Sequence, residues 1–160
     1  MGEELRLSSL VYHELWEPRT ETRARCRRTL AALPWSRVPL HEAPAYDCCC
    51  GIYALASPEH AARYLESEVE NAPRAVQRVL GAVSLWGRVV ETDRGWRASC
   101  AHPQRIVVPS RRLERLAAIA LWPYRPTPGA VARELEAYGV EVDVVDAARL
   151  PAIRSPHAVR

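Results

Sequence analysis

The chain has 160 residues, of which 22 are basic and 19 acidic, and its formal net charge is +3. This length favours one domain with an ordinary hydrophobic core, and the charge is too balanced to indicate a nucleic-acid binder from composition alone. No apolar run reaches the ~18 residues of a membrane span, and the N-terminus lacks the basic and apolar regions of a signal peptide. We therefore expect a cytoplasmic protein, whose cysteines are free thiols or metal ligands rather than disulfides.

The basic residues are all arginine, and the chain has neither lysine nor phenylalanine. Codons for these two amino acids are AT-rich, so the composition indicates a GC-rich genome. Selection for guanidinium groups over ammonium groups would need support beyond composition.

The first half of the chain predicts two strands and a helix. The apolar runs at 10–16 and 51–56 are typical of strands. Between them lies an arginine-rich stretch with a short helix predicted over 27–33. Ser57 and Pro58 then provide an N-cap and a first helical residue. The apolar residues of this helix fall on one face: Ala61, Tyr64, Leu65 and Val69.

The centre of the sequence predicts a long β-hairpin. Its arms are residues 79–91 and 96–108, which are rich in Val, Ile and Trp, and residues 92–95 supply the turn. Gly81 and Gly87 lie inside the first arm, where glycines indicate bulges or bends of the kind found in coiled sheets and small barrels.

The C-terminal part predicts two more helices and a strand. Ser110 is a cap for a helix with an apolar stripe over 113–121, and Thr127 begins a last helix that Gly139 ends. The alternating residues 140–145 follow as a closing strand. We expect residues 1–150 to form a single α+β domain and residues 151–160 to form a flexible tail. The fold would be a mainly antiparallel, barrel-like sheet with three helices and a metal-stapled loop.

The densest chemical signal is a group of cysteines with a histidine. Four of the five cysteines fall between positions 26 and 50, and the best ligand set is spaced Cys-x14-His-x6-Cys-x-Cys. It consists of Cys26, His41, Cys48 and Cys50, hereafter the Cys3His cluster. Three sulfurs and one nitrogen suit a tetrahedral zinc ion, and with four protein ligands the site would be closed and structural. Cys49 would point away from its neighbours in an extended segment, and we expect it to be a core thiol.

Three other interpretations of these residues stay open. They could be buried free cysteines, since cysteine is a common small core residue. They could hold a [2Fe–2S] cluster, which would indicate electron transfer or redox sensing. One of them could instead be a catalytic nucleophile.

The motif His41-x-Ala-Pro-x3-Cys48-x-Cys50-Gly-Ile-Tyr-Ala, with Ala24-x-Cys26 upstream and Leu-Trp-Gly-Arg-Val-Val-Glu over 85–91 downstream, resembles a family of uncharacterised actinobacterial proteins. The resemblance covers roughly residues 20–110. It implies the same four ligands and a GC-rich source, and it assigns no activity.

Other features give weaker functional hypotheses. Cys100 and His102 are two residues apart in a predicted strand and would share a face, which is the minimum for a thiolate nucleophile. No phosphate-binding loop, serine elbow or dinucleotide fingerprint accompanies them, so we favour a protein that is not an enzyme.

Arginine and tryptophan on the hairpin, and arginine around Cys26, could together contact an anionic partner. They are Trp86, Arg88, Arg94, Trp96 and Arg97 on the hairpin, and Arg19, Arg23, Arg25, Arg27 and Arg28 around Cys26. We favour a protein adaptor with a structural zinc ion. An iron–sulfur or thiol redox protein and a nucleic-acid or nucleotide-binding module are the alternatives.

Overall fold

The computed structural model describes residues 4–10, 14–28, 41–66, 77–110 and 126–152. The strands are β1 (Leu7–Ser8), β2 (Leu15–Trp16), β3 (Thr22–Arg23), β4 (Ile52–Leu55), β5 (Leu80–Thr92), β6 (Gly95–Ser110) and β7 (Glu141–Asp146). The helices are α1 (Pro58–Glu66) and α3 (Pro128–Leu135), with two 3₁₀ helices, η1 (Glu136–Tyr138) and η2 (Ala147–Ala152). The described part of the chain is therefore α+β, as predicted.

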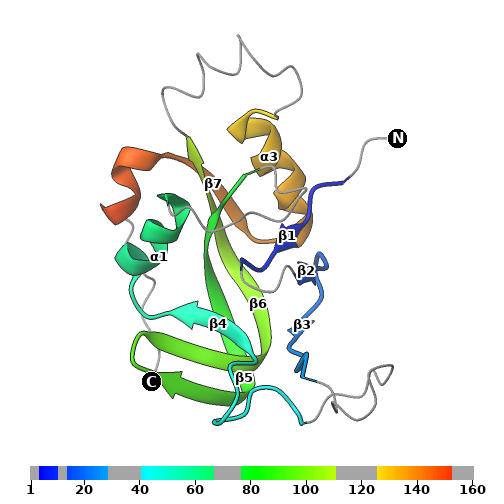
Figure 1. Ribbon diagram of the computed structural model, residues 1–160. Coiled ribbons are helices and arrows are strands. Elements are labelled where there is room, and N and C mark those ends of the chain that lie inside the picture. Colours follow the sequence, from blue (N-terminus) through cyan, green and yellow to red (C-terminus); the bar gives the residue numbers. More distant parts are fainter. Residues whose placement is uncertain (1–3, 11–13, 29–40, 67–76, 111–125, 153–160) are drawn as a thin grey trace.

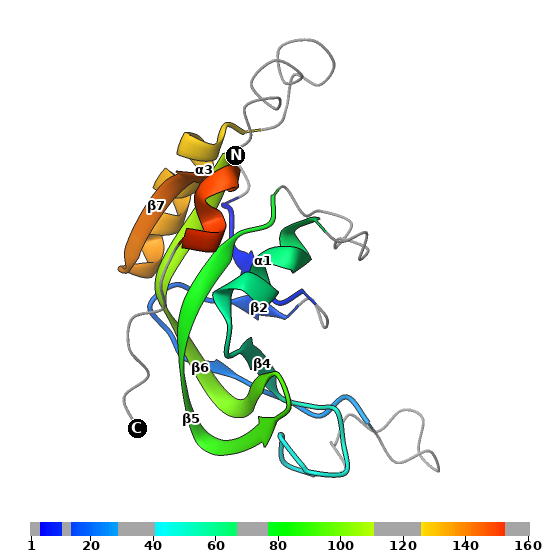
Figure 2. The same cartoon turned by 90° about the vertical axis from the view of Figure 1, so that its left-hand side faces the viewer.

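The predicted hairpin is confirmed and forms the frame of the molecule. Strands β5 and β6 pair antiparallel from Leu80 opposite Val107 to Thr92 opposite Gly95. The register shifts twice, next to Gly81 and across Gly87, as the glycines predicted. Figure 2 shows both strands curving strongly along their length. Glycine is needed at position 87, because its φ of 78° is in the left-handed region.

The other edge of β6 is shared by three segments in succession. Strand β4 pairs with residues 95–98, β3 with residues 100–101, and β7 with residues 105–110. Only β7 runs parallel to β6, so the sheet is mainly antiparallel as expected. The barrel was a wrong expectation, because the sheet stays open (Figure 1). Its members beside β6 are short separate strands, and none of the described strands links them to the free edge of β5.

The N-terminal strand was only partly predicted. Within the described residues of the predicted strand its regular part is Leu15–Trp16, which pairs with the unpredicted β1. The turn between β1 and β2 is closed by Ser9, whose backbone N–H donates to the Glu14 carbonyl and whose hydroxyl accepts from the Glu14 N–H. These contacts turn the chain back where a continuous strand was expected.

The two described α-helices begin where the sequence predicted, α1 at Pro58 and α3 at Pro128; Val69, expected on the apolar face of the first, lies outside the described residues. Helix α3 begins after Thr127, whose hydroxyl accepts a hydrogen bond from the backbone N–H of Ala130. It continues as η1 and ends at Gly139, whose φ is 72°. The third predicted helix, over 113–121, and the short helix over 27–33 lie largely or wholly outside the described residues.

The main core lies between α3 and the inner face of β6. Its buried members are Trp16, Ala101, Ile106, Val108, Val131, Ala132, Leu135 and Tyr138. A second, smaller cluster consists of Ala43 with the three cysteines of the Cys3His cluster. The cysteine region therefore has its own interior, apart from the main core. The domain boundary at residue 150 stays a prediction, and η2 extends to Ala152.

Candidate metal centre

The Cys3His cluster comes together at one point. One ligand atom from each of its four residues lies within 4.8 Å of the ligand atoms of the other three. All three sulfurs are buried, and the imidazole is half-buried. The structure thus brings together the four residues that the sequence singled out, and it leaves the other two cysteines, Cys49 and Cys100, outside the group.

The sheet explains how residues so distant in sequence meet. After β3 the chain leaves β6 with a hydrogen bond from the Ala24 N–H to the Ser99 carbonyl, at 2.8 Å. It returns at β4, where Ile52 lies opposite Ala98. The intervening residues 24–51, hereafter the ligand loop, therefore begin and end at adjacent positions of β6. This closure carries Cys26 on the outgoing end toward Cys48 and Cys50 on the returning end.

The distances within the cluster agree with one tetrahedral ion. Ligands at ~2.3 Å from zinc are separated by about 3.8 Å when both are sulfur, and by about 3.6 Å when one is an imidazole nitrogen. The Sγ atoms of Cys26 and Cys48 are 3.8 Å apart, and the Nε2 atom of His41 is 3.3 Å from Cys26 Sγ. A disulfide needs about 2.05 Å, and all five cysteines are free. The four residues therefore fit a zinc ion in both donor chemistry and spacing.

The imidazole of His41 is oriented by its own loop. Its Nδ1–H donates to the carbonyl of Glu42 at 3.0 Å, which leaves the Nε2 lone pair directed toward the cluster. A hydrogen bond on the distal nitrogen is the usual way in which a metal-binding histidine is held in the correct tautomer. The pKa of His41 is raised, first by this carbonyl and next by the Cys48 thiol.

The thiols differ strongly in acidity. The pKa of Cys48 is lowered to about 6, mainly by the hydrogen bond from the Cys50 backbone N–H. The pKa of Cys50 is raised to about 11, mainly by burial. The thiolate form is thus favoured at Cys48, and a cysteine must be a thiolate to bind a metal.

Arg97 contacts the ligand loop, which the sequence did not predict. It was expected on a basic surface of the hairpin, but its side chain is only 7% exposed. Its Nη1 atom donates to the carbonyls of Ala45, Cys48 and Cys50, so one guanidinium binds the ligand loop at three points. The only signal in the sequence was the alternation of a strand, which places residue 97 on the same face as residue 95; the pairing of β4 beside it is seen only in the structure.

The neighbours of the cluster are less buried than expected. The prediction of Cys49 as a core thiol is wrong, because its side chain is exposed. Its carbonyl accepts a hydrogen bond from the hydroxyl of Tyr53, whose ring lies 5.9 Å from the Arg97 guanidinium. Cys100 and His102 both lie on β6 without a hydrogen bond between them, so nothing in this described strand makes them a nucleophile and base.

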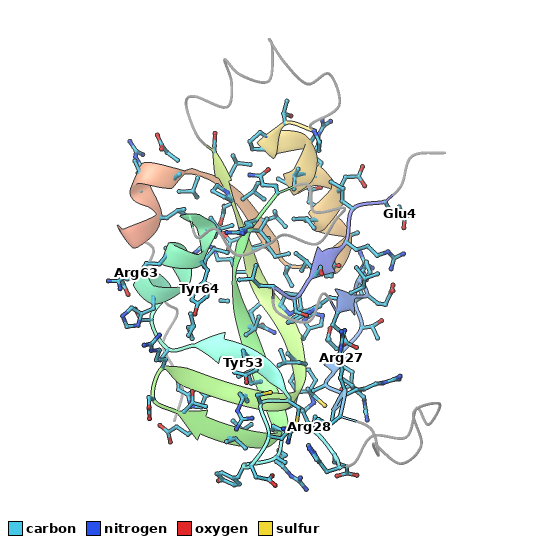
Figure 3. All side chains as sticks on the ribbon, viewed as in Figure 1. Glu4, Arg27, Arg28, Tyr53, Arg63 and Tyr64 are labelled. Atoms are coloured by element: carbon cyan, nitrogen blue, oxygen red, sulfur yellow. The ribbon has the colours of Figure 1, made fainter. Side chains whose placement is uncertain are left out.

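Three of the remaining arginines near the cluster lie close to acidic side chains. Arg23 contacts Glu21, Arg27 lies 4.0 Å from Glu14, and Arg88 lies 3.8 Å from Glu42. Figure 3 shows Arg27 and Arg28 near the same end of the sheet as Tyr53. Trp86 is 37% exposed, while Trp96 is half-buried. The expected arginine and tryptophan surface therefore lacks Arg97 and is partly neutralised.

No protein-family model, curated protein or solved structure matches the chain. Among the described residues, no helix is both long and apolar enough to cross a membrane.

Proposed function

We propose that the chain is a small zinc-binding module, in which the ion closes the ligand loop and fixes it as a binding surface for a protein partner. One observation carries the proposal: the four donor atoms of the Cys3His cluster converge within 4.8 Å. A zinc ion with four protein ligands has no open position for substrate, so its role is to hold the loop. A cytoplasmic location is part of the proposal, because thiols stay reduced there.

The spacing supports a single ion over an iron–sulfur cluster. The ligands of a [2Fe–2S] cluster bind two different irons, so opposite pairs of ligands are further apart than the edges of one tetrahedron. All four donors here lie within 4.8 Å of one another, with 3.3 Å between the His41 Nε2 and Cys26 Sγ atoms and 3.8 Å between the Sγ atoms of Cys26 and Cys48. A redox protein is therefore the less favoured function.

The surface of the ligand loop supports a protein partner. Tyr46 lies within the loop and is 85% exposed, and Tyr53 follows it on β4 and is 49% exposed. Tyrosine on a rigid loop gives a large contact area at low cost in side-chain entropy, which is why it is frequent in binding surfaces. The neighbouring arginines with acidic partners leave less free positive charge for phosphate groups.

Site-specific crosslinking tests the proposal. A photo-reactive phenylalanine analogue in place of Tyr46 should crosslink one protein in cells, and the additional change Cys48→Ser should abolish the crosslink. The same analogue at Tyr64, which is exposed on α1, is the positional control. Crosslinks to RNA or DNA that weaken with salt would support the nucleic-acid alternative instead. Equal crosslinking with and without Cys48 would contradict the role of the metal.

A further inference from the structure

Arg97 is buried and has no acidic partner among the residues that the structure describes. The ion pairs of the described residues join other arginines to glutamate or aspartate, and none of them includes Arg97. Its side chain nevertheless has an exposed fraction of only 7%. A buried charge is costly unless an opposite charge compensates for it, and carbonyl dipoles compensate for only part of that cost. The position of Arg97 therefore calls for a nearby anion.

The Cys3His cluster becomes such an anion when it binds zinc. Three thiolates and a neutral imidazole around a divalent ion leave one net negative charge. The guanidinium binds the backbone of the same loop through the carbonyls of Cys48 and Cys50. The sulfurs of these two residues belong to the cluster. The positive group and two of the cysteine ligands are thus attached to one short segment.

The hydrogen bonds of Arg97 also match the shape of the loop. Nη1 carries two hydrogens and has three carbonyl acceptors: that of Ala45 at 3.3 Å, that of Cys50 at 3.1 Å, and that of Cys48. The loop must curve around the guanidinium to place all three carbonyls there. A lysine would supply the charge without the planar fork, and a glutamine would supply a donor without the charge.

We propose that Arg97 is the counter-charge of the zinc–thiolate centre, in addition to being the hydrogen-bonding clamp of the ligand loop. It acts through the ligands and touches no metal, so it is a positioning residue. This inference rests on the proposed zinc site and extends it: the positive charge at position 97 favours a centre with three thiolates and a divalent ion.

Competition with a chelator for zinc distinguishes the effect of the Arg97 charge from the effect of its hydrogen bonds. We expect Arg97→Gln and Arg97→Met to weaken zinc binding about 10- to 100-fold, as is usual for residues that support metal ligands. Arg97→Lys should retain most of the affinity. Arg94→Gln, at the exposed hairpin turn, is the matched control and should bind as tightly as the wild type. Affinity for Arg97→Gln equal to that for Arg97→Lys would overturn the counter-charge.

When iron replaces zinc, the reduction potential of the centre can be measured. This potential responds to the charge at position 97 and not to the shape of the loop alone. Oxidation of bound ferrous to ferric ion by an electrode removes one electron and makes the centre neutral, so a nearby positive charge favours the ferrous form. Arg97→Gln and Arg97→Met should lower the reduction potential, whereas Arg97→Lys should stay near the wild type. Equal potentials in all four proteins would contradict the proposal. A wild-type chain that binds neither zinc nor iron would instead refute the metal site itself, and the two failures are thereby distinguishable.

Discussion

The Nε2 atom of His41 lies 3.3 Å from the Sγ atom of Cys26, although fifteen positions separate the two residues in sequence. The contact is possible because the ligand loop leaves and rejoins β6 at neighbouring residues, Ser99 and Ala98. The hydrogen bond from His41 to Glu42 turns the free ring nitrogen toward the sulfurs. The sheet edge thus determines where a metal ion could bind.

The three adjacent cysteines allow a matched test of ligation. Cys48→Ser should weaken zinc binding by at least about 100-fold, since the ~10–16 kcal/mol of a structural zinc site is shared among four ligands. Cys49→Ser should leave the affinity unchanged, because this thiol is exposed and outside the cluster. Competition with a chromogenic chelator measures both constants. Equal losses in the two variants would show that the ligand set is wrong.

Removal of the ion should loosen the ligand loop while the hairpin persists. Among the described residues of the loop, the interior consists of the three buried cysteines and Ala43, with Ala24 and Ala45 packed against them, whereas the main core is built mainly from α3 and β6. Chelation should therefore speed proteolysis within residues 24–51 and leave the far-UV circular dichroism of the sheet. Loss of all secondary structure on chelation would show that the main core depends on the metal, and unchanged cleavage would argue against a structural ion.

Gly51 should not tolerate a side chain. Its φ is 122°, and an added Cβ would lie 3.0 Å from the Cβ of Pro44 and 3.1 Å from that of Arg97. Gly51→Ala should lower the free energy of unfolding by about 1–3 kcal/mol through this strain, and it should weaken zinc binding. Gly129→Ala is the control, because no atom lies within 4 Å of its Cβ position in α3. That change should be neutral or stabilise by up to about 1 kcal/mol. Chemical denaturation measures both.

The hydroxyl of Tyr138 ties the two ends of the domain together. It donates to the carbonyl of Trp16 and accepts from the N–H of Leu7 at 2.8 Å, and its side chain is fully buried. Tyr138→Phe leaves both backbone groups without this partner and should destabilise the chain by about 1–3 kcal/mol. Tyr46→Phe, on an exposed side chain, should change the free energy of unfolding very little. A similar value for the two variants would mean that water replaces the Tyr138 hydroxyl.

Local signals predicted the parts of the fold that depend on neighbours in sequence. The hairpin follows from two apolar arms around the turn at 92–95, and α3 follows from the cap at Thr127 and the terminator at Gly139. The open sheet could not be predicted in this way, because it depends on which short strands share an edge of β6. The barrel was inferred from the glycines alone, which report curvature and not closure.

The sequence predicted the four residues of the candidate site from their types and spacing. It did not predict the environment of the residues around them. The spacing of Cys26, His41, Cys48 and Cys50 sufficed to group them, because few other arrangements collect soft ligands so closely. The burial of Arg97 depends on β4 pairing beside it, which sequence spacing does not reveal. Cys49 was misplaced for a similar reason: the chain around it is a loop, so the alternation expected of an extended segment does not apply.

The most direct test of the zinc site is the metal content and spectrum of protein purified without oxygen. We predict one zinc per chain and, after exchange for cobalt, the intense visible bands of a tetrahedral ion with three thiolates. Cys49→Ser should give the same spectrum, since Cys49 is not a ligand. Iron with acid-labile sulfide, or no bound metal together with four reactive thiols in the region of residues 26–50, would contradict the account.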